Sequence, residues 1–314
     1  MLVLGGQQIM AGAMTVGQLV AFQALALGFM GPVTQLAGVA AQMQDARANL
    51  SLLEDTLHHP RAPEFERAAS AGMTGLAGHV ELRDVTFGHS RFAPPLLDGV
   101  SLTIEPGRRL GIVGGSGSGK STLALLIAGL YQPWSGEVRI DGRPMAEIPR
   151  TALRREVSVV DQNGFLFDGT VRDSVALWDS TLAQERIVES ARDAAIHHEI
   201  LARRGGYNSI VAEEGRNWSG GQRARMELAR AIATDPVILV LDEATAALDN
   251  RAEAQVMANL RRRGCTMVVI AHRLALVRDC DEVIVLSAGR IVQRGRPDAL
   301  ANEEGPFRAM LLSG

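Results

Sequence analysis

The stretch GGSGSGKST, residues 114–122, combines the residue types that hold a phosphate group. Glycines let backbone N–H groups wrap around a β-phosphate, the Lys120 ammonium can reach the β and γ oxygens, and the Ser121 hydroxyl can bind Mg²⁺. The stretch fits GxxxxGK[ST] between an apolar strand expected at 110–113 and an apolar helix expected at 123–130, as the motif requires. We predict a phosphate loop made of Gly114, Gly115, Ser116, Gly117, Ser118, Gly119, Lys120, Ser121 and Thr122.

Lys120 is the one lysine among 32 Lys and Arg residues. A compact ammonium on a slim stem fits a tight phosphate cradle, whereas a planar guanidinium does not. The alternative, a glycine-rich turn that binds nothing, is disfavoured because the strand, the helix and the lysine all stand where the motif needs them.

A second small-residue turn, SGGQ at residues 219–222, leads into a helical stretch. Backbone N–H groups and the helix dipole at such a start favour anions. One nucleotide does not need two such turns, so the ligand of the second turn has to be explained.

Two adjacent acids follow an apolar strand in VILVLDEATAALD. Asp242, at the strand end, can hold Mg²⁺, and Glu243 can orient or activate an attacking water. Adjacent acids can also serve only to start a helix. The phosphate loop in the same chain favours the catalytic interpretation.

Two more polar residues follow apolar strands: Gln162 in VSVVDQNGFLF and His272 in VVIAHRL. Either could reach a nucleotide at the same sheet edge, although a lone Gln or His at such a place is more often structural. The other histidines at 79, 197 and 198 lack this placement, and we expect them to be structural.

The charge balance bears on partners. The 32 basic and 35 acidic residues give a net charge of −3, without the basic run of a nucleic-acid arm, so nucleic acid is not expected as a partner. Cys265 and Cys280 lack metal-ligand spacing and are expected to be reduced core residues.

The first 44 residues carry no charged side chain, and residues 16–43 are long and apolar enough to cross a membrane. A signal peptide would need a positive start and a shorter apolar core; a buried core helix is the remaining alternative. The basic residues after position 46 favour a cytoplasmic exit. We expect a membrane remnant at 1–57, a Pro- and Ala-rich linker at 58–78, and an α/β domain at 79–314 with a parallel sheet and a smaller antiparallel β portion.

The order of these motifs, from the phosphate loop through Gln162, WSGGQ, VLVLDEAT and AALD to IAHR, resembles the nucleotide-binding domain of an ATP-binding cassette (ABC) transporter. The resemblance covers residues 78–314, and the apolar leader resembles the last membrane segments of an exporter half. Several stretches look closest to bacterial peptide and bacteriocin exporters. The resemblance implies a P-loop NTPase fold with a parallel sheet core, an antiparallel β subdomain and a helical subdomain, preceded by a transmembrane helix.

The resemblance also implies why two phosphate-binding turns exist. Two domains, most simply identical, pair head to tail, and the SGGQ turn of one closes over the ATP of the other. Ser219, Gly220 and Gly221 would contact the γ-phosphate of the partner's ATP, with Gln222 supporting the turn.

Further roles follow by position from the same resemblance. The cofactors are ATP and Mg²⁺. Glu243, His272 and Lys120 are the expected catalytic residues, Ser121, Gln162 and Asp242 the expected metal ligands, Asp249 lies in the loop across the dimer, and Glu213 senses the membrane domain.

Three residues depart from the family pattern. His89 stands where a Tyr usually stacks on adenine, which lowers the expected nucleotide affinity or makes it pH-sensitive. Trp218 replaces the usual Leu or Phe before SGGQ, and Ala246 replaces a common Ser.

The sequence therefore predicts the C-terminal part of an exporter half-transporter in the inner (plasma) membrane, with a cytoplasmic ATPase that powers export of a peptide-like cargo through helices outside this chain. Membrane lipid is an expected partner. The alternatives are a truncated ATPase without transport activity, a soluble importer subunit, and a chromosome or repair ATPase, which would carry a long coiled-coil insertion.

Overall fold

The structure is a computed structural model that describes residues 2–58, 75–161, 165–271 and 273–313. The chain divides into two compact units, Met1–Ala62 and Pro63–Gly314. Most of the predicted linker at 58–78 lies outside the described residues.

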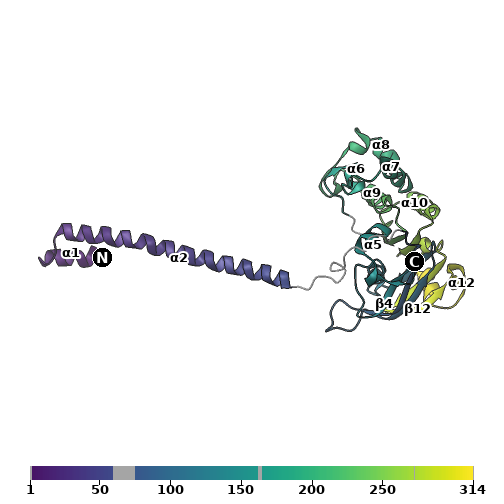
Figure 1. The fold of residues 1–314 in the computed structure, drawn as a ribbon, viewed down its shortest axis with the longest axis horizontal. Helices are drawn as coiled ribbons and strands as arrows, with labels where there is room; N and C mark the ends of the chain where they lie inside the picture. Colours follow the sequence, from purple (N-terminus) through teal and green to yellow (C-terminus); the bar gives the residue numbers. More distant parts are fainter. Residues whose placement is uncertain (1, 59–74, 162–164, 272, 314) are drawn as a thin grey trace. The chain divides into compact units, whose positions relative to one another are not determined.

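In its described part, the first unit consists of helices α1 (Leu2–Met10) and α2 (Val16–His58) (Figure 1). Helix α1 packs against the start of α2 through Gly5, where a Cβ atom would overlap the Leu19 side chain. Gly12, with a φ of 69°, lies in the turn between the helices, a conformation that glycine adopts easily. The chain therefore turns tightly between the two helices.

Helix α2 is a candidate membrane span by its length and apolar composition. It begins with a reciprocal cap, in which Gln18 N donates to Thr15 Oγ1 and Thr15 N donates to Gln18 Oε1. Pro32 lies inside the helix without ending it, as membrane helices tolerate. The helix continues beyond the apolar segment at 16–43 and ends at His58.

The second unit contains a six-stranded sheet in the order β12-β11-β3-β10-β9-β6. Only the pairing of β11 with β12 is antiparallel. Every residue of β9 and β10 is buried, as expected of a parallel sheet covered on both faces. The strands are β3 (Arg109–Gly114), β6 (Val157–Val160), β9 (Ile238–Asp242), β10 (Thr266–Ile270), β11 (Glu282–Ser287) and β12 (Arg290–Gly295).

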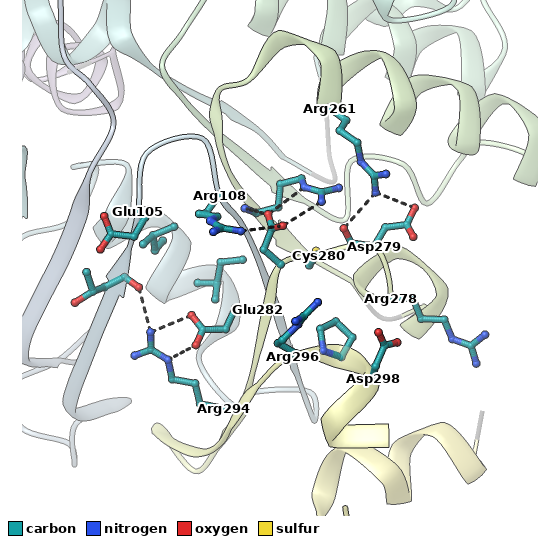
Figure 2. Close-up of a pocket in the computed structure, with 16 residues that line it drawn as sticks. Glu105, Arg108, Arg261, Arg278, Asp279, Cys280, Glu282, Arg294, Arg296 and Asp298 are labelled. Carbon is teal, nitrogen blue, oxygen red and sulfur yellow. Dashed lines mark hydrogen bonds and ion pairs between the residues drawn. The ribbon is translucent and has the colours of Figure 1, made fainter. Parts of the chain in front are cut away.

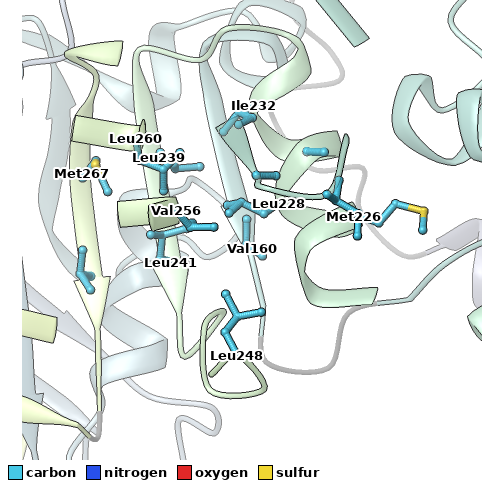
Figure 3. Close-up of a cluster of buried hydrophobic side chains, with 14 of the residues drawn as sticks. Val160, Met226, Leu228, Ile232, Leu239, Leu241, Leu248, Val256, Leu260 and Met267 are labelled. Carbon is cyan, nitrogen blue, oxygen red and sulfur yellow. The ribbon is translucent and has the colours of Figure 1, made fainter. Parts of the chain in front are cut away.

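Alternate residues of β9 contribute to two different cores, because successive side chains of a strand point to opposite faces. Leu239 and Leu241 pack with α9 (Gly220–Ala233) and α10 (Asn250–Arg263), whose apolar side chains surround them in Figure 3. On the other face, Ile238 and Val240 belong to the core that includes α4 (Lys120–Ile127). Helices thus cover both faces of the sheet, and the ends of its strands lie at the edges of the sheet.

A second, four-stranded antiparallel sheet has the order β2-β1-β4-β5. Its strands are β1 (Val80–Phe87), β2 (Leu97–Ile104), β4 (Ser135–Ile140) and β5 (Arg143–Pro144). The predicted antiparallel β portion at the start of this unit is confirmed.

A helical part follows β6 in the chain, and Figure 1 shows α6, α7 and α8 gathered beside α9. The bounds here are α5 (Arg150–Glu156), β7 (Gly169–Thr170), α6 (Val171–Ala176), α7 (Gln184–Asp193), α8 (His197–Leu201) and β8 (Ile210–Val211), and at the end of the chain α11 (Leu274–Val277), α12 (Pro297–Asn302) and α13 (Pro306–Ser313). Short 3-10 turns lie at Met145–Glu147, Gly206–Asn208 and Glu213–Gly215.

Candidate active site

The phosphate loop joins the carboxyl end of β3 to the start of α4. Glycine is required at two of its positions. A Cβ atom at Gly114 would overlap the backbone oxygen of Leu286, and one at Gly119 would lie 2.7 Å from Leu97 Cδ2. Gly119 also has a φ of 100°, which favours glycine. The middle of the loop, residues 115–117, is exposed.

Lys120 is 6% exposed, and its ammonium donates to the carbonyl oxygens of Gly114 and Gly115, both at 2.9 Å. Burial lowers the pKa of this ammonium, and the nearby carboxylates of Glu243 and Asp242 oppose the shift. No side chain of the described residues caps α4, which starts without an acidic residue in its first turn. The backbone N–H groups at this helix start are therefore not occupied by a side-chain cap or by an acid of the helix's own first turn.

Asp242 ends β9, and the Ser121 hydroxyl lies close enough to its carboxylate to affect the pKa of Asp242. Burial raises the pKa of Asp242; the charges of Asp161 and Glu243 act in the same direction, whereas Ser121 and Lys120 oppose them. A hydroxyl and a carboxylate side by side are oxygen ligands that Mg²⁺ accepts together with phosphate oxygens. The structure thus brings together the predicted residues of the two motifs.

Glu243 has a left-handed backbone conformation, with a φ of 54°. Its N–H donates to the Ile270 carbonyl at 3.1 Å, which ties it to the end of β10. Non-glycine residues in this conformation are uncommon and concentrate at functional sites. This backbone strain could not be read from the sequence.

Asp161 is a further acid close enough to Asp242 to affect its pKa, and the sequence analysis missed it. The available signal was its position: it directly follows β6, which pairs in parallel with β9. Carboxyl ends of neighbouring parallel strands share one edge of a sheet. Gln162, the next residue, lies outside the described residues.

His272 also lies outside the described residues. Its neighbours Ala271 and Arg273 line a cavity of about 630 Å³ together with Gly114 and Gly115. Ala271 and Arg273 therefore lie beside the phosphate loop, and the role of His272 stays a prediction.

The SGGQ turn begins α9 with a capping box. Gln222 N donates to Ser219 Oγ at 3.3 Å, and Ser219 N donates to Gln222 Oε1 at 3.1 Å. Ser219 and Gly220 are exposed. A Cβ atom at Gly221 would lie 3.1 Å from the Ala247 carbonyl oxygen, so the turn packs closely on the segment that leads to α10. Gln222 thus contacts the turn, and its role at a nucleotide stays a prediction.

Three other predicted residues have local partners. Asp249 caps α10, with Ala252 N donating to its carboxylate at 2.8 Å. Glu213 is exposed and forms an ion pair with Arg216 at 3.0 Å. The exposed His89 ring meets the rings of Phe87 and Tyr131 edge-on at 5.5 and 5.7 Å. Their nucleotide-related and membrane-related roles stay predictions.

Helix α9 is also tied to the chain that follows Gln162. Arg230 donates to the Phe165 carbonyl at 2.8 Å and pairs with the buried Glu227 at 3.1 Å. Burial raises the pKa of Glu227 and lowers that of Arg230. This contact, which sequence patterns do not reveal, connects two of the predicted site segments.

A separate cavity of about 680 Å³ lies at the starting ends of β3 and β11, at the sheet edge opposite the phosphate loop (Figure 2). It is lined by arginines and acids that pair with one another. Asp281 accepts hydrogen bonds from Arg109 N at 2.9 Å and Arg109 Nε at 3.3 Å, and Arg294 pairs with Glu282 at 2.6 Å. We interpret these contacts as a structural clamp between strands.

Residues 97–246, which include the phosphate loop, the SGGQ turn and the two acids, match the family model described as ABC transporter. The chain carries an ABC transporter ATP-binding domain. The predicted fold class and the prediction of an ABC-type ATPase domain are confirmed at the level of this family.

The relatives of this ABC domain agree with the family match. The chain is 38% identical to the exotoxin translocation ATP-binding protein PaxB of Pasteurella aerogenes over 307 residues, 97% of this chain and 43% of that protein. It is also 38% identical to the alpha-hemolysin translocation ATP-binding protein HlyB of Escherichia coli over 302 residues, 96% of this chain and 42% of that protein. The chain thus spans less than half the length of these relatives.

A solved structure of a bacterial Atm1-family ABC exporter with ATP bound matches 96% of this chain and 53% of its own, with 30% sequence identity and a TM-score of 0.79. The chain therefore has the fold of an ABC exporter's ATP-binding part with an N-terminal candidate membrane helix. The peptide or bacteriocin subtype stays a prediction, since the relatives are named for toxins.

Proposed function

We propose that this chain is the ATP-hydrolysing part of an exporter in the inner (plasma) membrane, with its ABC domain on the cytoplasmic side. The observation that carries this proposal is the meeting of Lys120, Ser121, Asp242 and Glu243 at the carboxyl ends of β3 and β9. Phosphoryl transfer needs these groups: a positioned cation, oxygen ligands for Mg²⁺, and a carboxylate that orients water.

In this proposal, the phosphate loop and the start of α4 bind the phosphates, and Lys120 neutralises the β and γ oxygens. Bound Mg²⁺, held by Ser121 and Asp242, would supply further charge stabilisation. Glu243 orients the attacking water and accepts its proton. We further propose that His272 contacts the γ-phosphate, that Gln162 links the metal to the membrane part, and that His89 lies against the adenine.

The proposal includes a head-to-tail pair of identical chains. Ser219, Gly220 and Gly221 would contact the ATP of the partner, and Asp249 would lie in the loop across the pair. The exposure of Ser219 and Gly220 supports this arrangement, as does the absence of an acid in the first turn of α9.

Residues 1–57 would form the membrane segment, 58–78 the linker and 79–314 the ATPase domain. The exposed apolar side chains of α2, such as Leu25, Leu27 and Phe29, support contact with lipid. We propose a peptide or protein cargo, a class supported by relatives that are named for toxin translocation. Glu213, exposed before the SGGQ turn, is the proposed sensor of the membrane domain.

The hydrolysis step is tested with Glu243→Gln in the full chain. We expect ATP hydrolysis to fall by about 10² to 10⁴-fold, the contribution of a general base, with ATP affinity nearly unchanged. Glu303→Gln, at an exposed position at the end of α12, is the control and should keep the wild-type rate. Wild-type turnover in Glu243→Gln would remove Glu243 from the mechanism.

The pair is tested by mixing two inactive chains, Lys120→Ala and Ser219→Ala. A mixed head-to-tail pair contains one site with both residues intact, so an equal mixture should recover about one quarter of the wild-type rate. If each chain completed its own site, the mixture would stay inactive.

A further inference from the structure

Trp218 is the buried anchor of the exposed SGGQ turn. It is 3% exposed, whereas the next residues, Ser219 and Gly220, are exposed. Its backbone N–H donates to the Gly215 carbonyl at 2.8 Å, and its backbone carbonyl accepts from Arg223 at 3.2 Å. The Trp218 backbone therefore fixes the point from which the turn projects, and its ring is buried.

Arg203 holds this anchor from a distant part of the chain, just after α8. Its guanidinium carbon lies 3.5 Å from the centre of the Trp218 ring, and its Nη2 donates to the Asn217 carbonyl at 2.7 Å. A planar guanidinium can stack on an indole and donate a directed hydrogen bond at the same time, which an ammonium cannot do. One side chain thus holds both the Trp218 ring and the peptide bond between Asn217 and Trp218.

The Asn217 side chain extends these contacts to the segment around Glu213. Its carbonyl oxygen accepts from Ala212 N at 3.1 Å, and its amide donates to the Ile210 carbonyl at 2.8 Å. The end of α8, the segment at 210–212 and the SGGQ turn therefore meet at Arg203 and Asn217.

We propose that Arg203 is a positioning residue for the SGGQ turn and acts through its stacking on Trp218. The inference deepens the proposed function, because a well-placed turn matters only if it completes a partner's ATP site. It also gives a physical role to Trp218, the departure from the family pattern. Loss of the stack lets the turn sample wrong orientations, so pairing over ATP weakens while ATP binding within one chain does not.

The test compares Arg203→Lys with Arg204→Lys in the full chain. Arg204 is the exposed neighbour and serves as the matched control. We expect Arg203→Lys to need about three- to tenfold more protein for half-maximal hydrolysis, a shift that matches a lost cation–π contact, with unchanged ATP affinity at low protein concentration. Arg204→Lys should match wild type in both measurements.

A double-mutant cycle with Trp218→Leu tests whether Arg203 acts through the Trp218 ring. If Arg203 acts through the indole, Arg203→Lys should have little further effect in the Trp218→Leu chain. Additive effects of the two substitutions would overturn the inference. So would an unchanged protein concentration for half-maximal hydrolysis in Arg203→Lys. Trp218→Phe keeps an aromatic ring and should retain most of the coupling, which separates the stack from a general loss of folding.

Amide hydrogen exchange at residues 219–222 provides a readout that does not depend on hydrolysis. Exchange should be faster in Arg203→Lys than in Arg204→Lys, with the rest of α9 unchanged. If the wild-type chain did not hydrolyse ATP, the proposed function would fail, and equal exchange in the two variants would separately reject the positioning role.

Discussion

Helices α4 and α9 begin differently, although in both the first backbone N–H groups have no partner within the helix. Helix α4 has a left-handed glycine, Gly119, and no side-chain cap among the described residues, and the buried Lys120 follows directly. Helix α9 is capped by its own Ser219 and Gln222, and Ser219 and Gly220 at its start are exposed. The start of α4 can therefore surround an anion bound to its own chain. The start of α9 is already capped and presents exposed residues on its outer face.

The start of helix α10 differs from both. Helix α10 begins with the carboxylate of Asp249 and carries Glu253 in its first turn, whereas neither α4 nor α9 has an acid there. Carboxylates at a helix start take the place of a bound anion and repel another. Of these three helices, the two whose starts are predicted to meet phosphate are free of them.

The largest expected difference between the two starts is in ATP affinity. Lys120→Ala removes a charge-assisted contact and should weaken ATP binding by about 100-fold, close to 3 kcal/mol. Ser219→Ala should change the affinity less than about twofold, because one chain binds ATP without its own SGGQ turn. Calorimetric titration with ATP at low protein concentration measures both, and equal losses would refute the division of roles.

Glycine substitutions sharpen the comparison at the level of folding. Gly119→Ala forces an alanine into a φ of 100° beside Leu97 and should destabilise the fold by about 1–3 kcal/mol. Gly220 has no atom within 4 Å of an added Cβ. The free energy of unfolding of Gly220→Ala should therefore lie within about 0.5 kcal/mol of the wild-type value. This variant should lose hydrolysis only in the assembled pair.

Urea unfolding of both glycine variants, together with hydrolysis against protein concentration, provides the measurement. A large loss of stability in Gly220→Ala would show that the turn is built into its own chain's fold rather than presented to a partner.

The smallest effect is expected for Gln222→Ala, which removes half of the capping box. The Ser219 side chain still accepts from the backbone N–H of residue 222, so the cost should be about 0.5 kcal/mol in thermal unfolding. Gln222→Glu, which keeps an acceptor, should recover this stability but place a negative charge near the partner's phosphates. Hydrolysis in Gln222→Glu is thus expected to fall below that of Gln222→Ala.

The strands and the order of the motifs along the chain were predictable, because each strand and each motif has a strong local sequence pattern. Fully apolar runs at 237–241 and 267–270 indicated a covered parallel sheet, and polar residues directly after such strands indicated one common edge of the sheet. Lys120, Ser121 and Asp242 met there as predicted. The reason is that the edge position of a residue follows from topology alone.

Contacts between distant segments were not predictable. The stacking of Arg203 on Trp218 joins residues whose proximity depends on how α8 and α9 pack. The bond from Arg230 to the Phe165 carbonyl is of the same kind. Arginines are frequent in this chain, and nothing in a single sequence distinguishes an arginine that pairs across the fold from one that is solvated.

The Asp281 clamp described above has a consequence for acid stability. Hydrogen bonds from Arg109 overcome the opposing effect of burial and hold the pKa of Asp281 below its ordinary value of 3.8. Its stabilisation is complete above that value and is lost as the pH falls through the lower, folded-state pKa. At the other end of the sheet, burial raises the pKa of Asp242, so protonation there relieves the fold instead. Acid therefore acts in opposite directions at the two ends of one sheet, weakening the strand clamp while it relaxes the phosphate-binding edge.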